Sequence, residues 1–161
     1  MSSAEVIRRR AGRVVLLDEH DRILMLQGFD PTRGDPPWWF TPGGGVEGDE
    51  STKDAARREL REETGLDFPD LIGPIWCRST EFDFYGAHYE QYEEFFLARV
   101  AAHELVDDAW TELERTTVIG HRWLSVEQLQ ELEGKLFPRM LVAQVGNLVS
   151  EGVPAEMIEI E

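Results

Sequence analysis

The stretch that decides the fold is "GGVEGDESTKDAARRELREETGL", residues 44–66. It places Glu59, Glu62 and Glu63 within little more than one helical turn. At the rotation of an α-helix these three side chains share roughly 100° of arc, and Arg57 and Arg61 point the other way. Like charges at this spacing weaken a helix, so the carboxylates form either a solvated face or the ligand set of a cation.

The residues before the helix favour the cation. Gly43, Gly44 and Gly45 let the backbone adopt conformations closed to other residues and approach a ligand closely. Carboxylate oxygens are the hard ligands that Mg²⁺ and Mn²⁺ prefer. A glycine-rich loop that leads into an acidic helix face therefore suits a metal–phosphate site.

The spacing of these residues matches a known motif. Gly44 is followed after five residues by Glu50 and, after seven more, by "RELREETGL" at 58–66. This is the pattern G-x5-E-x7-R-E-U-x-E-E-x-G-U, with Leu60 and Leu66 at the bulky aliphatic positions U. The chain thus resembles the Nudix hydrolases, including the MutT-like members, through an intact Nudix box.

The resemblance implies a fold and a reaction. The expected fold is α/β (α+β), an α/β/α sandwich with a central mixed sheet, in one domain over residues 1–161. The expected reaction is hydrolysis of a pyrophosphate bond in a nucleoside diphosphate linked to another moiety. The expected cofactor is Mg²⁺ or Mn²⁺, because phosphoryl transfer depends on charge neutralisation and in-line positioning.

The resemblance also assigns roles to residues. It implies that Glu59, Glu62 and Glu63 are catalytic and bind the metal, with Glu63 the most direct ligand. The backbone carbonyl of Gly43 joins them as a metal ligand. A structural role within the motif falls to Gly44, Glu50, Arg58 and Gly65, with Arg58 and Glu50 bridging loop and helix.

The general base stays open between a box glutamate and a carboxylate further along the chain. The distal candidates are Glu93, Glu94, Glu112 and Glu114. Glu93 and Glu94 are neighbours in a predicted strand, so only one of the two is expected to point inward.

Three aromatic residues are candidates for substrate binding, because an aromatic ring can stack on a nucleobase. Trp38 and Trp39 lie directly before the glycine loop, and Tyr85 lies in a predicted hairpin turn. All three are equally compatible with a place in the core or the sheet. The sequence does not choose among nucleoside triphosphates, dinucleoside polyphosphates, nucleotide sugars and capped RNA.

Composition limits the partners. The chain has 161 residues, 42% of them hydrophobic, and a formal net charge of −16. Such a surface disfavours duplex nucleic acid but allows a small phosphorylated ligand at a local cation site. No apolar run reaches the roughly 20 residues of a membrane span, and the lone Cys77 fits a reducing cytoplasm. We expect a cytoplasmic monomer or homodimer that binds no membrane.

The patterns also predict individual elements. Strands are expected at residues 14–17 and 23–26, around "WWF" at 38–40, through 71–100 with a turn at "YGAH", and at "IGHRWL". Residues 43–50 are expected to be a loop and 107–117 an acidic loop. Helices are expected at 51–64, ended by Gly65, after Ser125 with a capping box, and at 138–150.

The sequence is also compatible with two other functions. The first is a non-catalytic Nudix-fold module that senses a nucleotide, which an eroded box would favour. The second is isopentenyl-diphosphate isomerisation on a related scaffold, which calls for additional Cys and Glu chemistry. The intact box and the position of Cys77 after it favour the hydrolase.

Overall fold

The structure is a computed structural model that describes residues 5–30, 32, 34, 36–66, 70–101, 118–132 and 135–161. The strands are β1 (Val6–Leu17), β2 (Ile23–Gly28), β3 (Trp38–Phe40), β4 (Gly43–Gly45), β5 (Ile72–Phe84), β6 (Ala87–Arg99), β7 (Val118–Leu124), β8 (Lys135–Phe137) and β9 (Ile158–Glu159). The helices are α1 (Thr52–Thr64), α3 (Val126–Glu131) and α4 (Leu141–Glu151). In the part of the chain described, no helix has the length and apolar character to cross a membrane.

The strands form one mixed sheet in the order β8-β3-β2-β1-β6-β5-β9, with β4 paired to β1 and β7 to β2. The pairs β1–β6, β3–β8 and β5–β9 are parallel and the others antiparallel. Helix α1 packs on one face with Leu60 and Ala56. Helices α3 and α4 pack on the other through Leu129, Leu141 and Val145. The expected α/β/α sandwich around a mixed sheet is confirmed.

Most predicted elements are present, and the acidic loop expected at 107–117 lies outside the described residues. Two predictions were wrong: the start of the first strand and the loop at the glycines. Strand β1 begins at Val6 rather than near Val14, because β6 pairs with it in parallel over its whole length. The residues expected as a loop, Gly43–Gly45, form the short strand β4 against Ala11–Arg13 of β1. Without side chains these glycines carry no periodic signal, so their strand depends on the partner that β1 provides.

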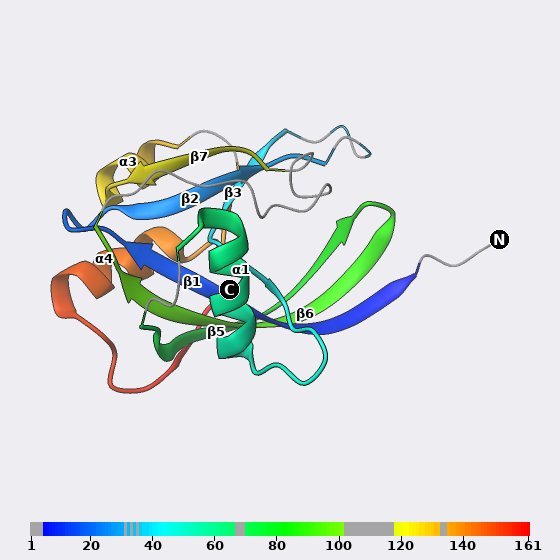
Figure 1. The fold of residues 1–161 in the computed structure, drawn as a ribbon. Helices are drawn as coiled ribbons and strands as arrows, with labels where there is room; N and C mark the ends of the chain where they lie inside the picture. The colour runs from blue at the N-terminus through cyan, green and yellow to red at the C-terminus, as the bar shows by residue number, and fades with distance from the viewer. Residues whose placement is uncertain are drawn as a thin grey trace.

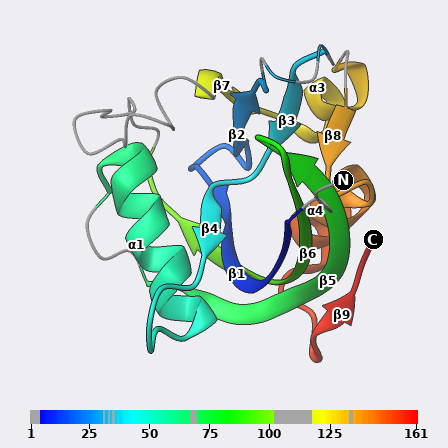
Figure 2. The same cartoon turned by 90° about the vertical axis from the view of Figure 1, so that its right-hand side faces the viewer.

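The sheet curls, so that the turn of the β5–β6 hairpin comes close to the end of β2 and to β3 (Figures 1 and 2). The hairpin turns at Tyr85 and Gly86, as the sequence predicts. The backbone N–H of Tyr85 donates to Asp30 Oδ2 at 3.1 Å, just beyond β2. The ring of Phe84 lies edge-on to Trp38 of β3, with centroids 6.4 Å apart. We call the face of β1, β5 and β6 opposite α1 the inner face; it carries Arg9, Arg13, Arg78, Phe82, Tyr89, Gln91 and Glu93.

Helix α1 lies unusually close to β1 at Gly12. A Cβ added to Gly12 would lie 1.9 Å from the carbonyl oxygen of Thr52 and 2.8 Å from the backbone nitrogen of Ala56. Both neighbours are backbone atoms of the helix, so neither can rotate away. The absence of a side chain at Gly12 therefore fixes how closely the acidic helix approaches the sheet.

Gly12→Ala should destabilise the protein by about 1–3 kcal/mol or more, because the methyl group forces α1 away from β1. Its matched control is Gly146→Ala in α4, where a Cβ meets only Val126 Cγ1 at 3.9 Å. There alanine should stabilise the helix by about 0.5–1 kcal/mol. Urea unfolding of both variants measures the two shifts. Equal effects of the two substitutions would contradict the close contact at Gly12.

Candidate active site

The two ends of α1 are fixed by local interactions. Ser51 caps the first turn, accepting from the backbone N–H of Asp54 while the Asp54 carboxylate accepts from Ser51 N–H. Gly65 ends the helix at φ 76°, a left-handed conformation that favours glycine. These caps and the contact at Gly12 fix where the acidic face of α1 lies.

Arg58 is the hub of this face. Its guanidinium donates from Nε to Glu50 Oε2 at 2.8 Å and from Nη2 to Glu50 Oε1 at 3.0 Å, a two-point ion pair. Nη2 also donates to the carbonyl oxygen of Gly45 at 2.9 Å. Nη1 lies 3.0 Å from Glu59 Oε1 and 3.4 Å from Glu62 Oε2. The bond to Glu50 is the largest of several effects that raise the pKa of Arg58. The structure thus brings Glu50, Arg58 and two of the three box glutamates together.

Glu63 points to a different neighbour. Its side chain is buried, at 3% exposure, and its Oε1 accepts from the backbone N–H of Gly43 at 3.0 Å. The carbonyl oxygen of Gly43, expected as a metal ligand, accepts from Arg13 Nη1 at 3.0 Å. Gly44 leaves room for Glu59, whose Oε1 would lie 2.4 Å from a Cβ there. The short glycine strand β4 is therefore packed directly against the acidic face of α1.

Glu93 lies at the centre of a buried charge network on the inner face. Its side chain is 1% exposed, and Oε2 accepts from Arg13 Nε at 2.6 Å. Oε1 accepts from Arg78 Nε at 2.9 Å and from Arg78 Nη2 at 2.6 Å. Burial by itself would raise the pKa of Glu93, but the two arginines outweigh it and lower the pKa. Both carboxylate oxygens are thus committed to guanidinium groups, which makes Glu93 a charge partner.

The other distal candidates lie elsewhere. Glu94 faces α1, where Oε1 accepts from Thr52 Oγ1 at 2.5 Å, and its side chain is 16% exposed. Glu93 and Glu94 do point to opposite faces, but both faces of the sheet are covered, so both carboxylates are largely buried. Glu112 and Glu114 lie outside the described residues.

The aromatic candidates separate into different environments. Trp39 is 7% exposed and belongs to the core cluster with Met25 and Leu141. Trp38 is partly exposed on β3 and faces Phe84. Tyr85, at φ 48°, occupies the hairpin turn and packs edge-on to Phe84 at 4.8 Å. Trp38 and Tyr85 are therefore partly exposed residues, and Trp39 is buried.

Sequence reasoning missed two arginines of the inner face, Arg13 and Arg78. Arg9 lies in "IRRR", residues 7–10, for which the sequence favours solvated charge over contact with a phosphate. The signal that could have found them is alternation, because Arg9, Ala11 and Arg13 share one face of an extended strand. The acidic partner for that face, Glu93, is supplied by a strand about eighty residues further along the chain.

The donor set of α1 fits a divalent cation. Glu59, Glu62 and Glu63 offer carboxylate oxygens, and the first two share one arginine with Glu50. Among the described residues, the one guanidinium of Arg58 contacts three carboxylates, so several hard oxygen ligands gather at this corner. Glu59 and Glu62 are 15% and 31% exposed, so water reaches them.

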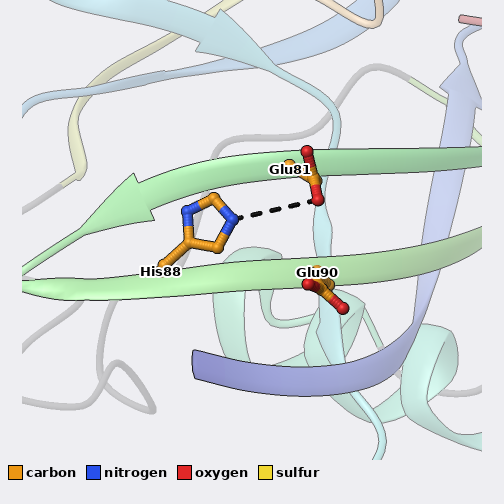
Figure 3. A group of neighbouring side chains, drawn as sticks. All are labelled: Glu81, His88 and Glu90. Carbon is orange, nitrogen blue, oxygen red and sulfur yellow. Dashed lines mark ion pairs between the residues drawn. The ribbon is translucent and has the colours of Figure 1, made fainter. Parts of the chain in front are cut away.

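A second acidic group lies on the hairpin, on the face that also carries α1. Ligand atoms of Glu81, His88 and Glu90 all lie within 4.8 Å of one another, and His88 points toward Glu81 across the two strands (Figure 3). Glu90 is paired with Arg8 at 2.7 Å, and His88 Nδ1 lies 2.8 Å from Asp83. The bond to Asp83 is the main cause of the raised pKa of His88. The group is an exposed ion-pair network that contains no box residue.

A hollow of about 1060 Å³ lies beside this network. It is bordered by the loop before α1, at Val46 and Gly48–Glu50, and by Arg8–Arg10, Ser79–Glu81 and Glu90–Tyr92. Of the residues assigned to the metal or to its motif, only Glu50 borders it. Its size alone does not make it the reaction site, because the carboxylates of α1 lie outside its lining.

Comparison with known proteins identifies the family to which the fold and the box belong. The model of the NUDIX domain matches residues 7–145. This chain belongs to the Nudix hydrolase family. An uncharacterised Nudix hydrolase of Bacillus subtilis (strain 168) is 47% identical over 51 residues, which are 32% of this chain and 29% of that protein. The aligned region thus spans less than a third of that relative.

Solved structures show the same Nudix fold. A MutT protein from Methanosarcina mazei Go1 superposes with a TM-score of 0.64 at 21% identity, over 92% of this chain and 100% of that one. The E. coli dihydroneopterin triphosphate pyrophosphohydrolase superposes with a TM-score of 0.63 at 22% identity, over 86% and 96%. Members of this family typically depend on divalent metal ions.

Glu93→Gln should destabilise this Nudix protein by about 3–5 kcal/mol, because it leaves two arginines without their buried carboxylate. Glu90→Gln is the control, since its ion pair with Arg8 is exposed and contributes about 0–1 kcal/mol. Urea unfolding at pH 7 measures both. A loss at Glu93 no larger than that at Glu90 would contradict the buried network.

The same network predicts a pH dependence. The pKa of Glu93 is lowered on folding. Its stabilisation is therefore present above the unfolded pKa of about 4.3 and disappears as pH falls through the folded value. As the pH falls below about 4.3, the free energy of unfolding should therefore decrease more steeply for the wild type than for Glu93→Gln. Parallel curves for the two proteins would show that Glu93 does not carry this dependence.

Proposed function

We propose that this protein is a Mg²⁺-dependent hydrolase that cleaves a pyrophosphate bond in a nucleoside diphosphate linked to another group. Mn²⁺ is the natural substitute for Mg²⁺. The observation that carries the proposal is the acidic face of α1. There, three glutamates of an intact box lie beside a glycine strand, with one arginine shared among Glu50, Glu59 and Glu62.

We assign the metal to Glu59, Glu62 and Glu63. Bound there, the ion would neutralise phosphate charge and lower the pKa of a coordinated water. Glu63 is held in place by the N–H of Gly43, which orients its carboxylate. Arg58 holds the helix to the loop through Glu50 and the carbonyl of Gly45. Arg58 thereby positions Glu59 and Glu62.

Among the described candidates for the general base, we favour a carboxylate of the box over Glu93. The Glu93 oxygens are engaged by Arg13 and Arg78, and its lowered pKa makes it a weak proton acceptor. Glu94 faces the opposite side of the sheet and is engaged by Thr52. Glu59 combines partial exposure with a place on the acidic face.

Hydrolysis should require added Mg²⁺ or Mn²⁺ and stop when EDTA is present. The physical reason is that clustered carboxylates repel an anionic substrate unless a cation neutralises them. Phosphate release measured across a panel of nucleoside triphosphates, dinucleoside polyphosphates and nucleotide sugars tests this and narrows the substrate. Full turnover after thorough chelation would exclude the assignment. Metal-dependent nucleotide binding without turnover of any substrate would favour a sensing module.

Glu63→Gln should lower kcat by about two orders of magnitude or more, because it removes a metal-binding charge while keeping the shape of the side chain. Its folding should be little changed. Glu50→Gln is the matched variant in the same box, and it removes one side of a two-point ion pair with Arg58. It should lower stability by about 1–3 kcal/mol.

Thermal melts beside steady-state kinetics separate the two roles. Near-normal turnover in Glu63→Gln would refute its place in the metal site. An unchanged melting temperature in Glu50→Gln would refute the structural role of the Glu50–Arg58 pair.

A further inference from the structure

Arg9 is the one described arginine of the inner face that has no carboxylate in ion-pair contact. Arg13 and Arg78 both pair with Glu93. Within the described residues, Arg9 has a single hydrogen bond through its side chain, from Nε to the amide oxygen of Gln91. Burial first, and then the neighbouring charge of Arg13, lower the pKa of Arg9. A partly buried guanidinium thus retains N–H donors without a matching anion.

Gln91 offers a second unused donor at the same place. Its residue is 3% exposed, and its Nε2 is buried without a hydrogen-bond partner. The amide cannot be reversed, because a guanidinium only donates and the amide oxygen must face Arg9. Among the described residues, Arg57 Nε is the only other buried side-chain nitrogen or oxygen without a hydrogen-bond partner. A buried donor without an acceptor costs free energy, so an acceptor at this place would be favourable.

Aromatic rings fix the position of these donors. The guanidinium of Arg9 lies over the ring of Tyr89, 4.7 Å from its centroid. Tyr89 in turn stacks on Phe82, with centroids 5.0 Å apart and planes 6° from parallel. A guanidinium held against a ring loses little freedom when it binds a ligand.

The position relates this cluster to the acidic helix. A Cβ on Gly45 would lie 3.0 Å from Arg9 Nη1, so Arg9 lies directly against β4. Glu59 lies close enough to contribute to the electrostatics of Arg9. Three guanidinium groups face one carboxylate, Glu93, on the described inner face of β1, β5 and β6. A ligand with one phosphate at the acidic helix can therefore extend toward a face of opposite charge.

We infer that Arg9 and Gln91 form a phosphate-binding subsite, which takes a phosphate of the nucleotide substrate other than the one held at the acidic helix. The inference rests on the proposed function and adds to it the residues that hold the rest of the anion. An oxyanion matches a donor-only pair, because it accepts from the guanidinium and the amide N–H at once. The ring of Tyr89, stacked on Phe82, packs against the guanidinium of Arg9 and limits its motion.

The test measures binding of an imido analogue of inorganic triphosphate, which resists hydrolysis, by calorimetry in Mg²⁺, so that a cation neutralises the acidic helix face and turnover does not contribute. Arg9→Gln should weaken binding about tenfold or more. Arg8→Gln is the matched control: it makes the same charge change on the next residue, which faces the other side and is 76% exposed. It should change binding less than about twofold. Gln91→Glu should also weaken binding, because it removes the donor and supplies Arg9 with a carboxylate.

Arg9→Lys keeps the charge but loses the planar pair of donors. This variant replaces Arg9→Gln in the binding test if Arg9→Gln does not fold. It should lose affinity in the same direction. The inference is overturned if triphosphate does not bind the wild type, or if the Arg9 and Arg8 variants lose affinity equally. It is also overturned if adenosine, which has no phosphate, depends on Arg9 as strongly.

Kinetics distinguish this inference from the proposed function. If the wild type hydrolyses a nucleotide and Arg9→Gln leaves KM unchanged, the subsite is wrong and the hydrolase stands. If no nucleotide is hydrolysed while triphosphate binding follows Arg9, the subsite stands and the hydrolase is wrong. A raised KM with weaker triphosphate binding in Arg9→Gln supports both.

Discussion

The close contact between α1 and β1 at Gly12 is the constraint on which the site depends. The helix backbone approaches so near that a single methyl group would overlap the carbonyl of Thr52. The same residue pairs with Gly44 of β4 on one side and with Glu94 of β6 on the other. Helix, glycine strand and central sheet therefore meet at one position without a side chain. Because the acidic residues project from this helix, their place relative to the glycine strand follows from that contact.

A chain of polar contacts connects the inner face of the sheet with the acidic face of α1. Arg78 binds Glu93, Glu93 binds Arg13, and Arg13 binds the carbonyl of Gly43. The N–H of Gly43 in turn binds Glu63. A buried charge network of this kind is stable only when each member is satisfied. It ties the inner face of the sheet to the helix on the opposite face, and it does so through the backbone of one glycine.

The box could be read from the sequence because its information is local. Gly65 as the end of α1, Ser51 as its beginning and the acidic face between them each follow from spacing within a few residues. The inner face could not be read in this way. Arg13 and Glu93 are eighty residues apart, and the register of two parallel strands brings them together. Strand β4 shows the same limit, since three glycines have no pattern and form a strand because Ala11–Arg13 of β1 pair with them.

The separation of charge explains how so acidic a chain can accommodate a phosphorylated ligand. Helix α1 contributes nothing to the net charge of −16, because its four acids are matched by four bases, and the acidic excess comes from the rest of the chain. On the described inner face, three guanidinium groups face one buried carboxylate, and the side chains of Arg13 and Arg78 are only 15% and 10% exposed. Electrostatic interactions strengthen as solvent is excluded, so a few inner arginines outweigh a larger number of exposed acids at short range. The same exclusion penalises any guanidinium without a partner. If each inner arginine had its own carboxylate, the inner face would be filled with ion pairs. Arg9 has no such carboxylate among the described residues, which favours binding of an anion from outside the chain.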